Sequence, residues 1–369
     1  MSWSTVRADQ FCTLITDGTH DSPKPQQSGW KLITSKHLKG HYIDFDSANW
    51  ISEADYLKVI SRSAVEQWDI LFSMIGTIGN IYLEKNPHVE YACKNMGIFK
   101  FSGNKENALW MYYYLKSPQA KAYIQTHLRG STQAYVPLGG LREMPVPVPP
   151  QSVRNEIIAV LRPIDEKIEC NNAINDNLQQ QAQAIYSSMF IDNPDPAWSH
   201  GHLSDLITVK YGKDHKKLAD GIYPVYGSGG IMRYVERPLY NKESVLIPRK
   251  GTLNNVMYVN QPFWSVDTMF YTEMKLPNVA KFVYHFVKAK DLASMNAGSA
   301  VPSMTTDILN AMEVVIPSAS ALEEFESLVA PMYEAMEAND VQSKALSQMR
   351  DTLLPKLMSG EIDVSAVLL

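Results

Sequence analysis

The chain has 369 residues, of which 45% are hydrophobic and 20% charged, a composition typical of a soluble globular protein with two or three domains. No run approaches the roughly 18 apolar residues of a membrane-spanning helix, and residues 1–10 lack the layout of a signal peptide, so we expect a cytoplasmic protein. Cys12, Cys93 and Cys170 lie far apart without a CxxC pair. They predict neither a zinc site nor a disulfide framework.

The net charge of -5 would disfavour nucleic-acid binding if it were evenly distributed. Residues 1–150 contain 15 basic residues (Lys and Arg) and 13 acidic residues (Asp and Glu), and residues 196–317 contain 13 basic and 10 acidic residues. By contrast, residues 151–195 contain 3 basic and 7 acidic residues, and residues 318–369 contain 3 basic and 9 acidic residues. The net negative charge is therefore confined to residues 151–195 and 318–369, and the other two segments have a small positive net charge. Contact with phosphate stays possible there, although solvated acidic helix faces are the simpler account of the acidic segments.

In the first 150 residues, short apolar runs between turn residues predict β-strands and then an aromatic-rich helical region. The predicted strands are 31–34, 70–75, 80–83 and 97–101, and the helical region lies near 108–128. The sequence PVPVPP at 145–150 then ends this segment, because consecutive prolines stop regular structure.

From Gln151 to Phe190 the sequence holds a helical pattern for about five heptads. Its first apolar row, at the d positions, contains Ile157, Ile164, Asn171, Leu178 and Ile185. The a positions are Leu161, Ile168, Asn175, Ala182 and Met189. This 4,3 spacing predicts one long helix that packs through a single seam.

The same helical pattern recurs 168 residues later. The second d row is Phe325, Met332, Asn339, Leu346 and Leu353, with Val329, Met336, Ser343, Arg350 and Leu357 at the a positions. The two d rows match in character at every step, including an Asn in the same layer. We therefore expect the two helices to pack on each other, with Asn171 and Asn339 fixing the register at some expense of stability.

The repeat extends upstream of the helices. Gly130 and Ser131 correspond to Gly298 and Ser299 at the same offset, and DILFSMIGTIGN at 69–80 aligns with SVLIPRKGTLNN at 244–255. The second copy has predicted strands at 206–209, 244–247, 255–259 and 269–273, and a helical region near 279–295. The chain therefore contains two copies of one unit.

These observations predict an α+β protein with two similar globular domains and two long antiparallel coiled-coil helices, related by a pseudo-twofold internal repeat. The predicted domains are 1–150 and 193–318, and the predicted spacer helices are 151–192 and 319–369, the second with a C-terminal tail.

In a chain with two related but divergent domains, a helical spacer would hold the two domains at a fixed separation. About 35 helical residues give a length on the order of 50 Å. Duplex DNA presents equivalent faces about one turn apart, so such an object suits two unlike half-sites with a fixed gap between them. A twin-domain scaffold that grips two proteins has the same outline, so this alternative stays open.

The order of motifs resembles the specificity subunit of Type I restriction-modification enzymes. The residues that carry the resemblance are LITDGTHDSPKP at 14–25, DILFSMIGTIGN at 69–80, PVPVPP, the helix opening RNEIIAVLRPIDEKIE and LLPKLMSGEI at 353–362. The single motifs are weakly specific, but their duplicated order is specific, and the resemblance covers essentially the whole chain.

The resemblance implies that each globular domain is a target recognition domain for one half of a split DNA sequence. It also implies that the helices set the spacing and bind two methyltransferase subunits, with restriction subunits joining through the complex. The chain itself would be non-catalytic and bind no cofactor. S-adenosylmethionine, ATP and magnesium would belong to the partner subunits.

Candidate DNA contacts are polar and basic residues in the predicted loops, since Lys and Arg bind phosphates and polar side chains read base edges. In the first domain they are Thr19, His20, Lys24, Lys36, His37 and Ser73, and in the second Lys213, Lys216, Lys217, Ser228, Arg233, Arg249 and Lys250. The Gly-Ser loops, with Ser131, Thr132, Gln133 and Tyr135 in one copy and Ser299 and Ser303 in the other, form a third candidate region. Each could equally be a solvated surface residue, and His20 and His37 could equally be packing or capping residues.

In the helices, faces away from the seam would remain for partners. Glu156, Arg162, Glu166, Glu324 and Glu326 are candidates, against the plain alternative of a solvated face.

The sequence contains no complete motif of a DNA methyltransferase, a nuclease or an ATP-binding enzyme. NPDP at 193–196 lacks the adjacent prolines and the aromatic residue of a DNA methyltransferase motif, and no GxxxxGK[ST] phosphate loop occurs. Asp267 with Glu273 and Lys275 has the outline of a nuclease centre, but the position aligned with Asp267 in the first copy is Asn95. A shared structural turn explains both positions better.

Overall fold

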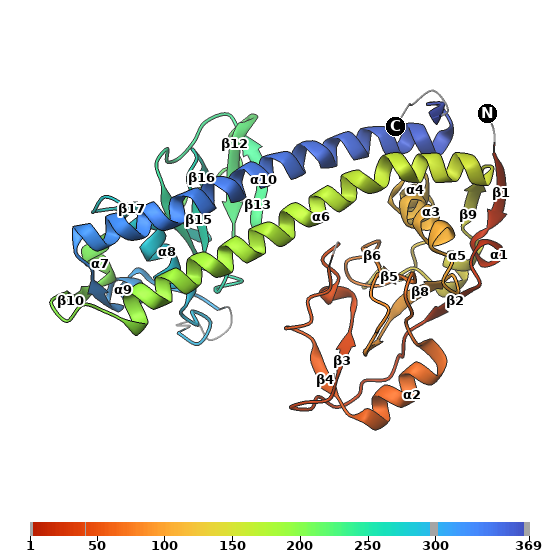
Figure 1. Cartoon of the computed structure of the whole chain (residues 1–369), viewed down its shortest axis with the longest axis horizontal. Coiled ribbons are helices and arrows are strands. Elements are labelled where there is room, and N and C mark those ends of the chain that lie inside the picture. Colours follow the sequence, from red (N-terminus) through yellow and green to blue (C-terminus); the bar gives the residue numbers. More distant parts are fainter. Residues whose placement is uncertain (1–2, 41, 296–301, 365–369) are drawn as a thin grey trace. The chain divides into compact units, whose positions relative to one another are not determined.

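The computed structural model describes residues 3–40, 42–295 and 302–364. The chain divides into two compact units, one formed by Met1–Asn171 with Val341–Leu369 and the other by Asn172–Asp340. Each unit contains one globular domain and one part of each long helix (Figure 1). The boundaries between the units therefore fall inside the helices, whereas the sequence divides the chain at the helix ends.

The described part of the first unit has strands and short helices that precede the first long helix. The strands are β1 (Ser4–Arg7), β2 (Leu14–Asp17), β3 (Trp30–Ile33), β4 (Asn49–Ile51), β5 (Ile70–Ser73), β6 (Ile81–Leu83), β7 (Tyr91–Cys93), β8 (Met96–Lys100) and β9 (Pro145–Val148). The helices are α1 (Ala8–Phe11), a 3-10 turn (Ser35–His37), α2 (Glu53–Ser63), α3 (Lys105–Lys116), α4 (Pro118–Thr126) and α5 (Leu138–Glu143).

These strands form three small sheets. The largest has the order β2-β8-β5-β6 and is antiparallel. In the second, β3 pairs with β4 antiparallel and with β7 parallel, and β1 pairs with β9. The aromatic side chains of α3, led by the fully buried Trp110 and Tyr113, fill the core beside β5. This explains why a short strand of continuous apolar residues is stable there.

The second unit contains the same elements with few exceptions. Its strands are β10 (Ser199–His202), β11 (Ile207–Tyr211), β12 (Asp220–Gly227), β13 (Gly230–Val235), β14 (Ser244–Pro248), β15 (Met257–Val259), β16 (Trp264–Ser265), β17 (Met269–Met274) and β18 (Glu313–Ile316). The helices are α7 (Leu203–Leu206), α8 (Ala280–Lys288) and α9 (Thr306–Asn310).

The sheets of the two units have the same topology. The order β11-β17-β14-β15 repeats β2-β8-β5-β6, the order β13-β12-β16 repeats β4-β3-β7, and β10-β18 repeats β1-β9. The predicted α+β class and internal repeat are confirmed. Among the described residues, helix α2 has no counterpart between β13 and β14.

The long helices are α6 (Gln151–Ser187), which ends in a π-helical turn at Ser188–Asp192, and α10 (Ala319–Ser359). In each unit the helix segments run antiparallel. In the first unit Asn171 donates to Ser343 Oγ at 3.1 Å, and in the second Asn339 donates to Asn175 Oδ1 at 2.8 Å. All the predicted d and a positions are buried or half-buried.

Within each unit, the asparagine of the d row forms a hydrogen bond with a polar residue of an a position on the other helix. Antiparallel pairing places a d position opposite an a position, so Asn171 lies against Ser343 and Asn339 against Asn175. Because these pairs are related by the 168-residue offset, the sequence identified the polar positions but not their partners.

In the first unit, a buried ion cluster attaches the globular domain to both long helices. Asp165 of α6 is 8% exposed and bonds Lys116 Nζ of α3 at 3.0 Å and Arg350 Nη1 of α10 at 2.8 Å. Burial would raise the pKa of Asp165, but the two cations outweigh burial and the pKa lies below its ordinary value.

The second unit uses an uncharged contact at the corresponding place. His285 of α8, fully buried, has Nδ1 2.8 Å from Gln183 Oε1 of α6 and Nε2 2.9 Å from the Tyr333 hydroxyl of α10. Burial lowers the pKa of His285 to about 4. YYYL at 112–115 aligns with YHFV at 284–287, so Tyr113 corresponds to His285, and Asp165 corresponds to Tyr333 at the 168-residue offset. The two units therefore attach the globular domain to the long helices with different side chains.

The buried ammonium of Lys281 forms a second contact between α8 and α10. It bonds Glu243 at 3.2 Å and Glu326 at 2.6 Å. Glu326, a candidate for partner binding, is half-buried, and its carboxylate already neutralises this buried lysine. No helix within the described ranges is long and apolar enough to cross a membrane.

Candidate nucleic-acid interface

In the first unit, several loops converge on one edge of the four-stranded sheet. Asp17 at the end of β2 pairs with Gly97, and Ser73 at the end of β5 pairs with Met96 at the start of β8. Because β8 is antiparallel to both neighbours, the loops after β2 and β5 lie beside the turn that precedes β8. We call this group of loops the recognition edge.

The Gly-Ser loop of the first unit joins the same edge. Val136 N donates to Met74 O at 2.9 Å, and Ile75 forms an isolated bridge with Tyr135. Two of the three candidate regions in the sequence, the loop after β5 and the Gly-Ser loop, are therefore held together by backbone hydrogen bonds.

The second unit repeats this arrangement. Tyr211 and Pro248 pair with Phe270 and Met269 at the start of β17. Met304 N donates to Arg249 O at 2.9 Å, and Lys250 forms a bridge with Ser303. These pairs are the sequence equivalents of Val136 with Met74 and of Tyr135 with Ile75. Ser299 lies outside the described residues.

The aligned turn has the same backbone in both units, but different side chains precede it. Gly76 and Gly251 both have positive φ, at 77° and 88°, a conformation that glycine adopts without strain. The buried Met74 and half-buried Ile75 come before the first glycine, whereas Arg249 and the exposed Lys250 come before the second. The two recognition edges therefore present different chemistry on one scaffold.

In the first unit, the loop after β2 is tied down by its own contacts. His20 lies between Asn95 Oδ1 at 2.8 Å and Asp17 Oδ2 at 2.9 Å. Lys58 of α2 bonds Asp21 at 2.9 Å and holds the pKa of that exposed carboxyl below its ordinary value. Arg62 donates to Gly18 O at 3.0 Å. The loop and α2 thus form one polar surface.

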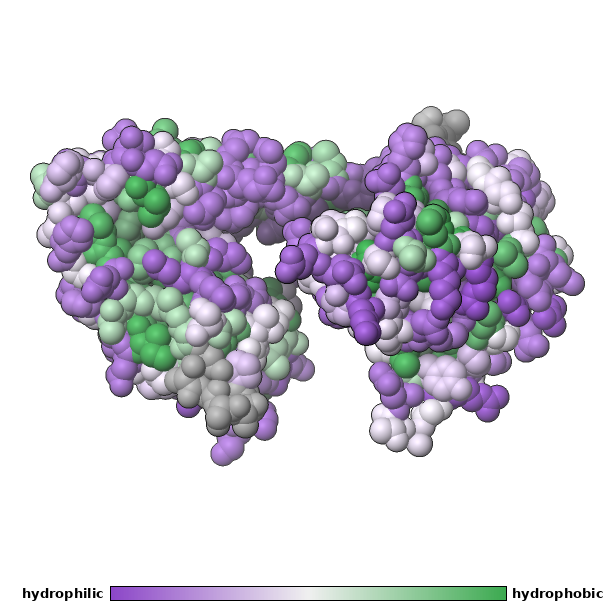
Figure 2. All heavy atoms as spheres, turned by 90° about the horizontal axis from the view of Figure 1, so that it is seen from below, coloured by the Kyte–Doolittle hydropathy of each residue, from purple (hydrophilic) through white to green (hydrophobic). Residues whose placement is uncertain are grey.

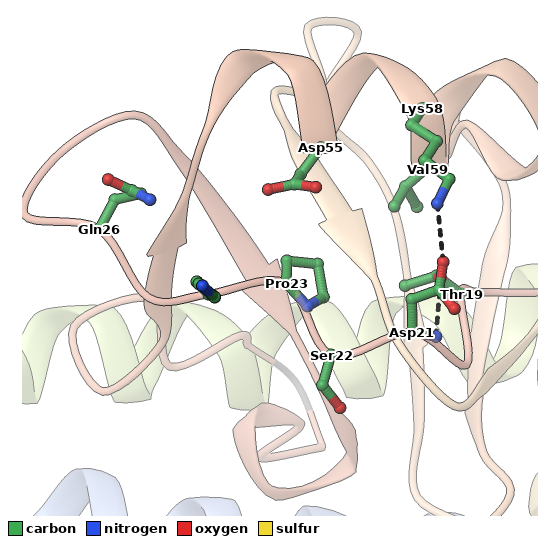
Figure 3. A pocket seen from close by; sticks show the side chains of 9 residues that line it. Thr19, Asp21, Ser22, Pro23, Gln26, Asp55, Lys58 and Val59 are labelled. Carbon is green, nitrogen blue, oxygen red and sulfur yellow. Dashed lines mark hydrogen bonds and ion pairs between the residues drawn. The ribbon is translucent and has the colours of Figure 1, made fainter.

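A shallow pocket of about 380 Å³ lies between this loop and α2 (Figure 3). Thr19, Asp21 and Lys24 line it from the loop, and Asp55 and Lys58 line it from the helix. Figure 3 shows the ion pair from Lys58 to Asp21 and the bond of the Asp21 amide to Thr19. Thr19 is half-buried, whereas Lys24 is exposed.

In the second unit, most of the candidate cations are exposed. Lys213, Lys216 and Lys217 follow β11 and are exposed. The Arg249 guanidinium lies 5.3 Å from the ring centre of Tyr211, and its Nη1 donates to Asp267 O at 3.0 Å. The aromatic ring and the Asp267 carbonyl together restrain the guanidinium, a group suited to a planar or anionic ligand.

The glycine-rich turn between β12 and β13 packs on the same loops. Asn255 donates to Ser228 O at 2.8 Å, and a Cβ added at Gly251 would lie 2.9 Å from Ser228 Oγ. Ser228 is therefore beside the turn that follows Arg249 and Lys250. Arg233 lies on β13 rather than on this turn, and its guanidinium bonds Asp220 Oδ1 at 2.7 Å and Leu218 O at 3.0 Å.

The structure corrects two candidates in the first unit. Ser73 is fully buried and donates to Ile75 O at 3.2 Å, so its hydroxyl does not reach the surface. His37 is 2% exposed and accepts from the Thr34 amide at 2.9 Å, the capping role that was its alternative. The neighbouring Lys36 is exposed.

Sequence reasoning missed several polar residues of the recognition edges. In the first unit these are Lys58, Arg62, Lys94 and Arg129, and in the second Tyr211. Helix α2, which carries Lys58 and Arg62, was not predicted, although Ser52 followed by acidic residues is a common helix start. That signal could have located two of these cations.

The nuclease outline is not supported. Asp267 precedes β17, while Glu273 lies near its far end and pairs with Lys210 at 3.6 Å. Six residues of extended strand separate side chains by about 20 Å, too far to share a metal ion. Among the described residues, no three His, Cys, Asp or Glu side chains are grouped closely enough to bind a metal.

Figure 2 shows one face of the molecule, on which hydrophilic side chains predominate and apolar side chains form patches between them. A duplicated sheet edge, with polar and basic loops that differ between the copies, defines a two-domain recognition protein. Sites of this kind suit two unlike polyanionic targets.

Comparison with known proteins places this chain in a family. The family model described as Type I restriction modification DNA specificity domain matches residues 3–180 and 197–325. The chain belongs to this family, and it contains two copies of the domain.

Relatives resemble the chain along most of its length. The specificity subunit of the Type I restriction enzyme MjaIX from Methanocaldococcus jannaschii is 24% identical, over 90% of this chain and 86% of the relative. The HindI specificity subunit from Haemophilus influenzae is 20% identical, over 85% and 90%. The crystal structure of an S subunit from M. genitalium has a TM-score of 0.58 at 17% identity, over 97% and 96%, which shows a shared fold.

Proposed function

We propose that this chain is the DNA-specificity subunit of a Type I restriction-modification complex and that each domain reads one half of a split DNA sequence. The observation that carries this proposal is the duplicated recognition edge. Its backbone is the same in both units, but its side chains differ, as the change from Met74 and Ile75 to Arg249 and Lys250 illustrates. Unlike edges would select unlike half-sites.

The long helices supply the spacing in this proposal. Their polar a and d pairs and continuous helical segments would hold a fixed register. Methyltransferase subunits would bind on the helix faces outside the seam, where Arg162 and Glu166 form an exposed ion pair at 2.6 Å. Glu156 and Glu324 lie on α6 and α10 outside the seam as well.

The chain would have no catalytic activity of its own and act in the cytoplasm on cellular DNA. Methyl transfer would belong to the modification subunits with S-adenosylmethionine, and ATP-dependent cleavage with magnesium would belong to restriction subunits. The relatives named as specificity subunits support this division of labour.

A domain exchange tests the reading of half-sites. The chain is assembled with its methyltransferase subunits, and methylated bases are mapped in a DNA library. Exchange of residues 1–150 for those of another family member should change one half-site and leave the other. An assembled complex that methylates or binds DNA without any sequence preference would instead favour a protein-interaction scaffold.

A helix insertion tests the spacing. One heptad inserted at equivalent places in α6 and α10 keeps the a and d seam and lengthens the helical part by about 10 Å. The gap between the half-sites should grow by about three base pairs at 3.4 Å each, with both half-sites unchanged. Altered half-sites with the original gap would contradict the role of the helices.

A further inference from the structure

Residues 129–135 of the first unit form a closed hairpin at the recognition edge. Arg129 and Tyr135 exchange both backbone hydrogen bonds, each at 2.9 Å. Gly130 has φ of 87°, and a Cβ there would lie 2.4 Å from the Gln133 carbonyl oxygen. A glycine is therefore required for this tight turn.

The hairpin is anchored in the sheet at one end and exposed at the other. The bridge between Tyr135 and Ile75 fixes its base to the loop after β5. Arg129, Ser131, Thr132 and Gln133 are all exposed. A short loop held at its base presents its side chains in a reproducible position, and preorganisation of this kind lowers the entropic cost of binding.

The side chains of the hairpin are available for a ligand. No hydrogen bond or ion pair joins the side chain of Arg129, Ser131, Thr132 or Gln133 to another described residue. By contrast, His20 and Arg62 on the same edge are already engaged by neighbouring groups. Residues 117–142 also contain no Asp or Glu, so the hairpin can approach a polyanion without local repulsion.

We propose that this hairpin enters the major groove of the first half-site, where Arg129 reads a guanine and Gln133 reads an adenine. Arginine matches the O6 and N7 acceptors of guanine, and glutamine matches the N6 donor and N7 acceptor of adenine. The inference rests on the proposed function and adds the residues and bases of one contact.

The second domain places its cations differently around the same backbone bridge. The residues aligned with Arg129 and Gln133 are Ala297 and Val301, which carry no base-reading group. There Lys250 stands opposite Ser303, in the place of Ile75 opposite Tyr135. The first domain therefore has its cation, Arg129, in the Gly-Ser loop, whereas the second has its cation, Lys250, in the loop after β14. The two domains would thus read DNA from different loops.

The test uses the full complex with methyltransferase subunits and maps methylated bases in a random library. Arg129→Ala should reduce discrimination for one guanine in one half-site by about 10- to 100-fold, the range of a bidentate contact. Gln133→Ala should relax one adenine of the same half-site. The unchanged second half-site reports that each variant is folded and assembled, and Lys121→Ala is the control for an exposed cation outside the hairpin.

An unchanged motif in the assembled Arg129→Ala complex would overturn the proposal, whether affinity falls uniformly, as for a phosphate contact, or stays the same. If Arg129→Ala fails to assemble, Arg129→Lys and Gln133→Ala decide by the same readout. Failure of the proposed function is distinguishable, because the unsubstituted complex would then show no split motif at all.

Discussion

Asn339 donates a hydrogen bond from its side-chain amide to Asn175 Oδ1 at 2.8 Å. Asn175 in turn donates to Asp340 Oδ1 at 2.8 Å and to Met336 O at 3.2 Å. The equivalent pair in the first unit is Asn171 with Ser343. Each unit therefore has a polar contact between α6 and α10 at the same position of the repeat.

Asn175→Ala should destabilise the chain by roughly 1–3 kcal/mol, because it leaves the half-buried Asn339 amide and the Asp340 carboxylate without this partner. Urea unfolding followed by circular dichroism measures the loss. The matched control is Asn177→Ala on the exposed face of α6, where the side chain accepts a hydrogen bond from Gln181 one turn away. Equal losses in the two variants would show that the Asn175 contacts contribute nothing specific.

The helices show what a sequence pattern can and cannot predict. Heptad spacing identified both seams and their polar positions, because burial of one helix face is imposed locally by the 3.6-residue period. The partner of each polar residue depends on the register between distant segments. The sequence therefore marked Asn171 as a polar position of the seam but could not show that it bonds Ser343.

The strands show a second limit. Strands β5 and β8 were predicted from their apolar runs, whereas β9 was interpreted as a proline-rich stop. In the structure PVPV pairs with β1, with Pro145 opposite Arg7 and Pro147 opposite Thr5. Prolines fit there because β1 and β9 pair with no other strand in the described part of the chain. Similarly, the sequence could not reveal that the Ser73 hydroxyl faces inward.

The ion cluster predicts that removal of the buried Asp165 carboxylate lowers the stability of the chain much more than removal of the exposed Asp351 carboxylate. Asp165→Ala should destabilise the chain by about 3 kcal/mol, because Lys116 and Arg350 would remain buried without a counter-charge. Asp351→Ala removes a second partner of Arg350, at 2.8 Å, but that carboxylate is 65% exposed. The control should therefore cost less than about 1 kcal/mol. Comparable losses in urea unfolding would contradict the role of Asp165.

His285 predicts acid sensitivity in the second unit. The folded-state pKa of about 4 lies below the ordinary value of 6.5, so protonation favours the unfolded chain. The stabilisation is complete above pH 6.5 and falls as the pH drops towards 4, by roughly 2 kcal/mol at pH 5. Tyr186 of α6 and Tyr333 of α10, which pack against the ring, are neutral across this range.

Unfolding free energies at pH 7.5 and pH 5 measure this effect. His285→Gln cannot take up a proton in this range, so its stability should change less between the two pH values than that of the parent chain. A pH dependence identical in the two proteins would assign the acid sensitivity to other groups.

Substitution of the lysines after β11 should change the affinity for DNA and its salt dependence, whereas substitution of Arg129 should change the sequence preference. Lys216 and Lys217 are exposed, and Lys216 N bonds Asp214 Oδ1 at 3.0 Å in the turn, so the loop has a defined shape without using either ammonium. If they contact phosphates, each change to alanine should weaken DNA binding uniformly across sequences. The slope of log affinity against log salt should fall by about 1 per lysine. Titrations of the assembled complex at several salt concentrations measure this slope, with Lys242→Ala as an exposed control in the same unit. A changed motif would make these lysines base readers, and an unchanged slope would place them away from the DNA.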